Sequence, residues 1–356
     1  PGGIYARGLE PMAVSVPAVS VSADPGQVAD SALGIDGTAR ALALCIGLDA
    51  ARVRSDLEQA IAHGRRNLVL ARNLDPECVI GLADAELRGI SVVREYRRIY
   101  PGGTTAAHIL GRCSPYHEPK DGLELRYAFV LSGRPGTRPR NVDAYGRSIL
   151  GADSSGVLPP EPGHNLVLTV DWSLQQAVEL ALDDCMKRNR PRTATCVVMD
   201  PRTGEILALA SRPNFDPNGL EPGTPEEIAA RLKNLPVVRQ YEPGSLFKVL
   251  LAAAVLEANE AGHSYHCSGS TVIGGLPLRC WDPRGHGDCD LARMVAKSCN
   301  VAAARFALAL GAERYHAFLQ TLGLGRRTGI ELPGEATGTL RPPEGMRERD
   351  LANLGF

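Results

Sequence analysis

The chain has 356 residues, of which 44% are hydrophobic, and its 39 basic and 40 acidic residues give a net charge of −1. This length and apolar content suffice for two domains with buried cores. The balanced charge argues against nucleic acid or a charged membrane surface as a partner. No apolar run approaches the roughly 18–20 residues that span a bilayer, and no signal peptide is visible.

The first part of the chain predicts a mixed domain. Residues 12–21 have the composition of a strand, and residues 50–61 form an arginine-rich helical pattern. Residues 151–163 (GADSSGVLPPEPG) are dense in residues that break helices and strands, so we expect a linker there. We therefore predict one domain over residues 1–163 and a second over residues 164–356.

The second domain is predicted to begin with a strand over residues 165–170 and a helix over residues 173–187. A β-hairpin should follow, with strands at 195–199 and 206–210 around the turn Asp-Pro-Arg-Thr-Gly. Helices are expected to dominate from there to about residue 322. Two strands followed by helices are typical of an α+β domain.

The most informative motif of the chain is Tyr-Glu-Pro-Gly-Ser-Leu-Phe-Lys, which ends at Lys248. It opens an apolar run, residues 249–256, that we expect to be helical. A serine in the first helical turn and a lysine three residues later lie on one face. Backbone N–H groups at a helix start favour the negative charge that develops when Ser245 attacks a carbonyl. A partly desolvated Lys248 has a lowered pKa and can act as the base.

Ser-x-x-Lys is weak by itself, because 18 serines and 5 lysines supply one by chance in roughly a quarter of such chains. Most such pairs are a helix cap followed by a solvated lysine. However, 34 of the 39 basic residues are arginine, so a lysine at position 248 stands out. A second element, Ser298-Cys299-Asn300, lies between helical patterns at 290–297 and 301–310. Together the two motifs predict a serine acyl-transfer site.

These motifs resemble those of the class B penicillin-binding proteins, the peptidoglycan D,D-transpeptidases. The similarity covers nearly the whole chain. Its further landmarks are ATCVVMDPRTGEILALAS at 194–211, Gly-His-Gly at 285–287, TGIELPGE at 328–335, and, upstream, Gly-Gly-Ile-Tyr at 2–5, Tyr-Pro-Gly at 100–102 and Gly-Leu-Glu at 122–124. The resemblance implies a non-catalytic pedestal or dimerisation-type domain over residues 1–163, followed by a penicillin-binding domain.

The resemblance also implies a role for each site residue. Ser245 would attack the carbonyl between the terminal D-alanines of a stem peptide, and an amine of a neighbouring strand would resolve the acyl-enzyme. Lys248 would activate Ser245, Ser298 would relay the proton to the leaving amine, and Asn300 would hold the substrate amide. β-Lactams would acylate Ser245. Substrate binding would thus involve Ser245, Ser298 and Asn300.

Further expectations concern location and partners. The resemblance implies a bacterial inner-membrane protein with its catalytic domain on the outer side, working with a membrane-embedded glycan polymerase and other cell-wall synthesis proteins. The family carries a third motif, Lys-Thr-Gly or Lys-Ser-Gly, which this sequence lacks. We therefore expect a fragment that is inactive and poorly folded by itself. The family places a membrane-anchoring helix just upstream of this sequence, so we also expect that the fragment lacks the anchor. The alternatives are a non-catalytic β-lactam sensor or scaffold, a serine β-lactamase and a D,D-carboxypeptidase.

Nine cysteines, an odd number, do not indicate a disulfide framework in a chain of this length. Four of them lie in apolar surroundings and are predicted to be small core residues: Cys45, Cys78, Cys185 and Cys196. A second group has the spacing of a Cys3His set suited to tetrahedral zinc: Cys267, Cys280, His286 and Cys299. If Ser298 and Asn300 point into the cleft, Cys299 points behind it, so a metal there would hold the turn from its back face.

Some elongation-type members of the family resemble this spacing, and for that reason we expect one structural zinc and an elongation role rather than a division role. Two alternatives stay open, a Cys267–Cys280 disulfide and a set of unrelated buried thiols. His263 and His266 could substitute as ligands, and Cys289 is a spare thiol.

Overall fold

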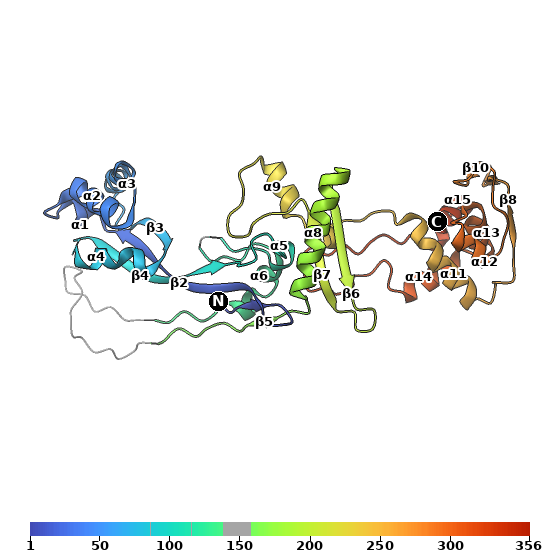
Figure 1. Cartoon of the computed structure of the whole chain (residues 1–356), viewed down its shortest axis with the longest axis horizontal. Coiled ribbons are helices and arrows are strands. Elements are labelled where there is room, and N and C mark those ends of the chain that lie inside the picture. Colours follow the sequence, from blue (N-terminus) through green and yellow to red (C-terminus); the bar gives the residue numbers. More distant parts are fainter. Residues whose placement is uncertain (86, 115, 138–157) are drawn as a thin grey trace. The chain divides into compact units, whose positions relative to one another are not determined.

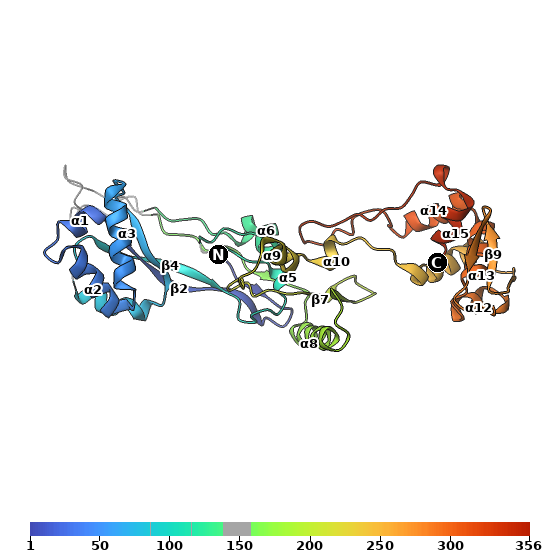
Figure 2. The ribbon, with the colours of Figure 1, turned by 90° about the horizontal axis from the view of Figure 1, so that it is seen from above.

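The computed structural model describes residues 1–85, 87–114, 116–137 and 158–356 (Figures 1 and 2). The chain divides into two compact units, one made of residues 1–236 with 331–333 and the other of residues 237–330 with 334–356. The first part of the predicted linker, residues 151–157, lies outside the described residues.

The first unit is built on a sheet in which the long strand β2 is central. β4 pairs with it antiparallel from Val14 to Ala23, and β3 pairs antiparallel with its second half. β1 pairs antiparallel with the start of β2 and parallel with β5. The strands are β1 (Ile4–Tyr5), β2 (Pro11–Ala23), β3 (Leu68–Leu74), β4 (Ile90–Ile99) and β5 (Leu166–Val167). The strand predicted at 12–21 is confirmed, whereas the one predicted at 165–170 shrinks to two residues.

Helices α1 (Pro25–Ala29), α2 (Gly34–Ile46) and α3 (Ala50–Ala62) pack on this sheet and enclose a core of Val19, Val21, Leu42, Val53 and Leu57 (Figure 2). The Asp49 carboxylate caps α3 by accepting from the backbone N–H of Arg52 at 2.8 Å, which starts the predicted helix. The remaining elements of this part are η1 (Pro76–Val79), α4 (Ile80–Asp84), α5 (Ala107–Leu110), α6 (Gly122–Arg126) and α7 (Ala128–Leu131).

The same unit contains α8 (Trp172–Asn189) and the hairpin β6 (Ala194–Met199) and β7 (Ile206–Arg212), which confirms the predicted helix and hairpin. Buried polar residues join α8 to β7. The Gln175 amide bonds to both the N–H and the carbonyl of Leu209. Glu179 forms an ion pair with Arg212 at 3.2 Å, and both side chains are only 8% exposed. Arg212 also contacts the more exposed Asp183 at 2.6 Å.

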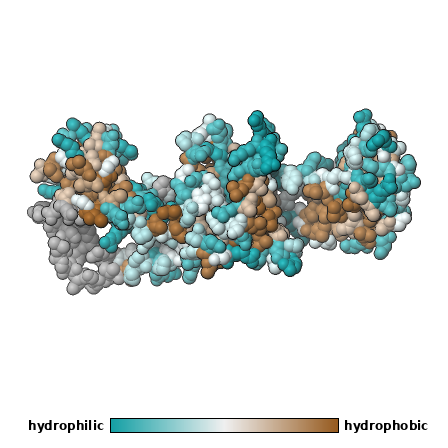
Figure 3. Space-filling model, in the orientation of Figure 1, coloured by the Kyte–Doolittle hydropathy of each residue, from teal (hydrophilic) through white to brown (hydrophobic). Residues whose placement is uncertain are grey.

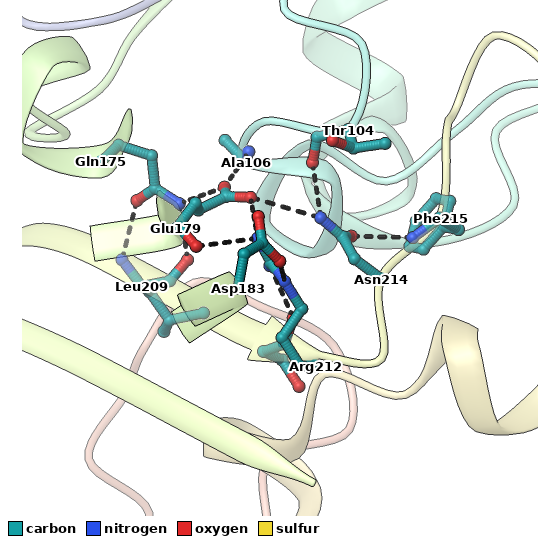
Figure 4. A network of polar contacts seen from close by, with 10 residues as sticks. Thr104, Ala106, Gln175, Glu179, Asp183, Leu209, Arg212, Asn214 and Phe215 are labelled. Carbon is teal, nitrogen blue, oxygen red and sulfur yellow. Dashed lines mark hydrogen bonds and ion pairs between the residues drawn. The ribbon is translucent and has the colours of Figure 1, made fainter. Parts of the chain in front are cut away.

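This polar network, drawn in Figure 4, extends to the loop before α5. The backbone N–H of Ala106 donates to the carboxylate of the α8 glutamate at 2.6 Å, and Asn214 donates to the carbonyl of Thr104 at 2.8 Å. The Asn218 amide bonds to both backbone groups of Tyr100. These contacts explain why the compact unit extends past the expected boundary at residue 163: residues after the linker hold a loop that lies before it.

α9 (Pro225–Leu232) closes the first unit, and α10 (Leu235–Val238) leads into the second. In the second unit α13 is central, and six of the seven residues from Val301 to Ala307 are buried. The remaining elements are η2 (Gly244–Leu246), α11 (Phe247–Glu257), β8 (Tyr265–Cys267), β9 (Ser270–Ile273), β10 (Leu276–Arg279), β11 (Gly287–Cys289), α12 (Leu291–Ala296), α13 (Asn300–Leu310), α14 (Ala312–Thr321), η3 (Pro343–Gly345) and α15 (Glu348–Leu354).

The prediction that helices dominate up to residue 322 is wrong for residues 265–289. Four short strands lie there and form two antiparallel pairs, β8 with β11 and β9 with β10. Strands of three or four residues are too short to show the alternation by which longer strands are recognised.

α11 is apolar on all sides. Leu251, Ala254 and Val255 are buried, whereas Val249 and Leu256 are more than half exposed. Figure 3 shows apolar surface, in brown, on the side of the second unit that carries α11 and α14. Among the described residues, no helix combines the length and apolar character needed to cross a membrane.

Candidate active site

Ser245 lies in the short 3₁₀ turn η2, directly before α11, and its side chain is exposed. We expected it in the first turn of the α-helix itself, so the structure places it slightly earlier. Gly244 has φ +61°, a left-handed conformation that glycine adopts at little cost, and this bends the chain into the turn. The serine hydroxyl is thereby presented at the entrance to the helix.

Lys248 occupies the next turn and is almost fully buried, with 2% of its surface exposed. Its Nζ lies 3.1 Å from Ser245 Oγ and 3.0 Å from Ser298 Oγ. It also contacts the Ser298 carbonyl oxygen at 2.8 Å and Asn300 Oδ1 at 2.6 Å. Burial lowers the pKa of the Lys248 ammonium, which favours the neutral amine that a base requires. The structure thus brings the four predicted catalytic residues together within one unit.

Ser298 sits between α12 and α13 in a left-handed conformation with φ +48°, which is uncommon for a residue with a side chain. Its Oγ lies 3.2 Å from Ser245 Oγ, so the two hydroxyls and the lysine amine form a closed triangle of hydrogen-bonding contacts. Asn300 begins α13, and its Nδ2 donates to the Arg279 carbonyl at 3.3 Å. We call residues 298–300 the catalytic turn.

The predicted Cys3His set converges behind this turn. Its four donor atoms lie within 4.8 Å of one another, and all four residues are buried: Cys267, Cys280, His286 and Cys299. His286 Nδ1 lies 3.9 Å from Cys267 Sγ and 3.5 Å from Cys280 Sγ, and Cys280 Sγ lies 3.9 Å from Cys299 Sγ. In a tetrahedron with Zn–S bonds of about 2.3 Å and Zn–N bonds of about 2.0 Å, neighbouring donors are about 3.5–3.8 Å apart. The set therefore fits zinc.

Local structure explains how these residues meet. Cys267 ends β8, and the His286 N–H donates to its carbonyl at 3.0 Å. Gly285 makes this approach possible, because a Cβ at that position would lie 2.1 Å from the Cys267 carbonyl oxygen. Cys299 caps α13, with its Sγ accepting from the Ala302 N–H at 3.4 Å.

The pKa values of two of the thiols shift in opposite directions. Burial raises the pKa of Cys299. Burial also acts to raise the pKa of Cys280, but backbone N–H groups near it, among them that of Asn300, outweigh the burial and lower it.

The two other candidate histidines lie on the surface, where His263 contacts Glu260 and His266 contacts Asp288. Cys289 is buried beside Cys299 but is not one of the four. All nine cysteines lie in the described part of the chain and are free thiols. Of the four cysteines predicted to be small core residues, Cys45 is partly buried and packs against the core of the first unit. The prediction is wrong for Cys78, which is exposed, while Cys185 and Cys196 are partly exposed.

Two residues that bond the catalytic turn or the residue before it were missed from the sequence. Arg279 acts through its backbone carbonyl, and Trp281 donates its indole N–H to the carbonyl of Lys297 at 2.9 Å. Contacts to backbone atoms leave no pattern of residue types. The available signal was composition, since Trp281 is one of only two tryptophans and directly follows Cys280.

Comparison with known proteins divides the chain into two family matches. Residues 2–168 match the penicillin-binding protein dimerisation domain, and residues 194–356 match the penicillin binding protein transpeptidase domain. Stage V sporulation protein D of Bacillus subtilis is 34% identical over 274 residues, covering 76% of this chain and 42% of that protein. Peptidoglycan D,D-transpeptidase FtsI of Escherichia coli K12 is 31% identical over 368 residues, covering all of this chain and 58% of that protein.

The chain thus spans about half the length of the curated relatives it matches. Solved structures agree on the fold. Penicillin-binding protein 2 of Helicobacter pylori, solved in complex with MreC, matches with a TM-score of 0.78 at 21% identity, covering 99% of this chain and 71% of that one. Penicillin Binding Protein 2X of Streptococcus thermophilus matches with a TM-score of 0.76 at 22% identity, covering 100% of this chain and 55% of that one.

Proposed function

Because this chain belongs to the penicillin-binding proteins that carry a dimerisation domain ahead of a transpeptidase domain, we propose that it acts as a peptidoglycan D,D-transpeptidase. Its substrate is a stem peptide that ends in D-Ala-D-Ala. Ser245 attacks the carbonyl carbon between the two D-alanines, the terminal D-alanine leaves, and an amine of a neighbouring strand takes the acyl group. β-Lactams acylate the same serine because they mimic D-Ala-D-Ala.

The observation that carries this proposal is the triangle formed by Ser245 Oγ, Lys248 Nζ and Ser298 Oγ, with sides of 3.0–3.2 Å. The neutral Lys248 amine takes the proton from Ser245 Oγ as the new C–O bond forms. Ser298 Oγ is in contact with both groups, so it can pass a proton to the leaving nitrogen as the C–N bond breaks. Each proton transfer then occurs across one hydrogen bond.

Asn300 and the Ser245 backbone complete the proposed substrate contacts. The Ser245 N–H supplies one donor to the oxyanion of the tetrahedral intermediate. The Asn300 carboxamide binds the substrate backbone amide through Nδ2. In the structure Nδ2 donates to the Arg279 carbonyl at 3.3 Å, a longer contact than the 2.6 Å between Oδ1 and Lys248. The lysine contact through Oδ1 is kept, so the amide group stays oriented while it binds substrate.

We also propose that Cys267, Cys280, His286 and Cys299 hold one structural zinc. The convergence of their donor atoms within 4.8 Å of one another supports this, as does the burial of all four side chains. A zinc ion there takes no part in acyl transfer. It would link the end of β8 and two loop positions to the start of α13, and so stabilise the catalytic turn from behind.

For location, we propose the outer face of the bacterial inner membrane, because peptidoglycan cross-linking takes place there, with the chain linked to a membrane anchor. The partners proposed are a membrane-embedded glycan polymerase and other cell-wall synthesis proteins, in an elongation role. The solved complex of a similar H. pylori protein with MreC supports a protein partner of this kind.

A fluorescent penicillin tests the proposed function. The full-length protein should form a covalent adduct, and peptide mass spectrometry should place it on Ser245. Ser245→Ala should abolish the adduct while retaining the melting temperature, because the exposed hydroxyl contributes little to packing. Undiminished labelling of Ser245→Ala, or an adduct on another residue, would contradict the mechanism.

A further inference from the structure

Residues 279–281 run alongside the catalytic turn in antiparallel order, and we call this segment the clip. Each of its three residues contacts the turn or the residue before it. The pairs, with the clip residue first, are Arg279 with Asn300 (3.3 Å), Cys280 with Cys299 (3.9 Å) and Trp281 with Lys297 (2.9 Å). The clip thus forms hydrogen bonds to the chain on both sides of Ser298.

Trp281 is the unusual member of the clip. The side chain is large and apolar, yet 63% of the residue is exposed, so the ring does not fill a core. One part of the ring lies near His286, with ring centroids 5.2 Å apart. The indole N–H is the only hydrogen-bond donor of the side chain, and it points to the carbonyl oxygen of Lys297.

That carbonyl has a direct effect on the next residue. The Lys297 carbonyl and the Ser298 N–H belong to one planar peptide group. A bond that fixes the carbonyl therefore fixes the plane from which the φ angle of Ser298 is measured. The left-handed φ of +48° is disfavoured for a residue with a side chain, so it persists only where the surroundings hold it.

We propose that Trp281 is a positioning residue for acyl transfer. Its indole N–H holds the peptide plane between Lys297 and Ser298, and this keeps Ser298 in the conformation that directs its hydroxyl to Ser245. The inference rests on the proposed function, since it concerns the geometry of that reaction. It predicts that loss of the N–H slows acylation without weakening the binding that precedes it.

The test measures penicillin acylation by stopped flow, which separates the dissociation constant of the first complex from the acylation rate constant. Trp281→Phe keeps an aromatic ring beside His286 and removes the N–H. The acylation rate constant should fall about three- to tenfold, the worth of one hydrogen bond, while the dissociation constant stays within about twofold. Val272→Ala is the control, because Val272 is equally exposed at 63% and should leave both constants unchanged. A Trp281→Phe protein that acylates at the wild-type rate would overturn the proposal.

A double-mutant cycle separates positioning from a general structural role. In a Ser298→Ala background the effect of Trp281→Phe should nearly vanish, because the group being positioned is gone. An undiminished effect would mean that Trp281 does not act through Ser298. The hydrogen bond can also be tested without relying on any variant's activity: the indole proton of Trp281, identified by its loss in Trp281→Phe, should exchange with solvent more slowly than that of free tryptophan. Exchange at the free rate would also overturn the proposal.

Failure of the positioning role can be told apart from failure of the proposed function. If the wild-type protein forms no adduct on Ser245, the transpeptidase proposal fails first. If the wild type is acylated and Trp281→Phe is acylated equally fast, only the positioning role fails.

Discussion

The Nζ of Lys248 lies 2.8 Å from the backbone carbonyl oxygen of Ser298, so one buried amine joins two chain segments that are 50 residues apart. Because the acceptor is a main-chain atom, this contact does not depend on the side chain at position 298. The same amine contacts Ser245, and the lysine therefore orients the nucleophile and the catalytic turn together.

The first prediction concerns Lys248 as the base. Lys248→Ala should lower the rate of penicillin acylation by at least about a hundredfold, because general-base catalysis contributes roughly that much and the turn loses its main anchor. Lys233→Ala serves as the control, since that lysine is exposed. Time courses of fluorescent labelling measure both rates. Equal rates for the two variants would exclude Lys248 as the base.

The second prediction is the pH dependence of acylation. Burial lowers the pKa of Lys248, so the neutral, reactive amine becomes populated at a lower pH than for an ordinary lysine near 10.4. The acylation rate should rise with pH, and its midpoint should lie below that ordinary value. Rates measured from about pH 6 to about pH 11 give the profile. A midpoint at or above the ordinary lysine value would contradict the role of burial, and Lys248→Ala should remove this step from the profile.

The third prediction concerns the metal. Protein purified without chelators should contain close to one zinc per chain. Cys299→Ser should lose it, with a lower melting temperature and slower acylation, because the turn is no longer held from behind. Serine is chosen because it can still cap α13, so the variant removes the ligand and keeps the cap.

Cys185→Ser is the matched control, as Cys185 lies outside the set and should leave zinc content unchanged. Elemental analysis measures the stoichiometry. A value near zero, together with a Cys267–Cys280 disulfide in mass spectrometry of the native protein, would favour the disulfide alternative.

The fourth prediction concerns the network of Figure 4. Arg212→Met should destabilise the first unit by about 3–5 kcal/mol, because it leaves the Glu179 carboxylate buried without its cation. Asp183→Asn should cost only about 0–1 kcal/mol, since the Asp183 side chain is 45% exposed. Urea denaturation compares the two variants with wild type. Similar losses of stability for both variants would show that the burial of the Arg212–Glu179 pair does not determine its contribution to stability.

Local sequence was enough to predict several features of this chain. The spacing of Ser245 and Lys248 places both on one face of a helical segment, and two β-rich runs on either side of a tight turn predict the β6–β7 hairpin. The Cys3His spacing likewise led to the four residues that converge. These features are readable because helical and strand periodicity, and short ligand spacings, relate residues that are close in sequence.

The tertiary structure alone decided which distant residues meet. It places Ser298 in a left-handed turn against Ser245 and brings Trp281 to the Lys297 carbonyl. It also joins the loop before α5 to residues beyond the predicted linker, so that the compact unit ends near Pro236. Such contacts depend on the paths of the intervening loops and on bonds to backbone atoms. Neither is encoded in residue periodicity, because every residue offers the same N–H and carbonyl groups apart from the N–H that proline lacks.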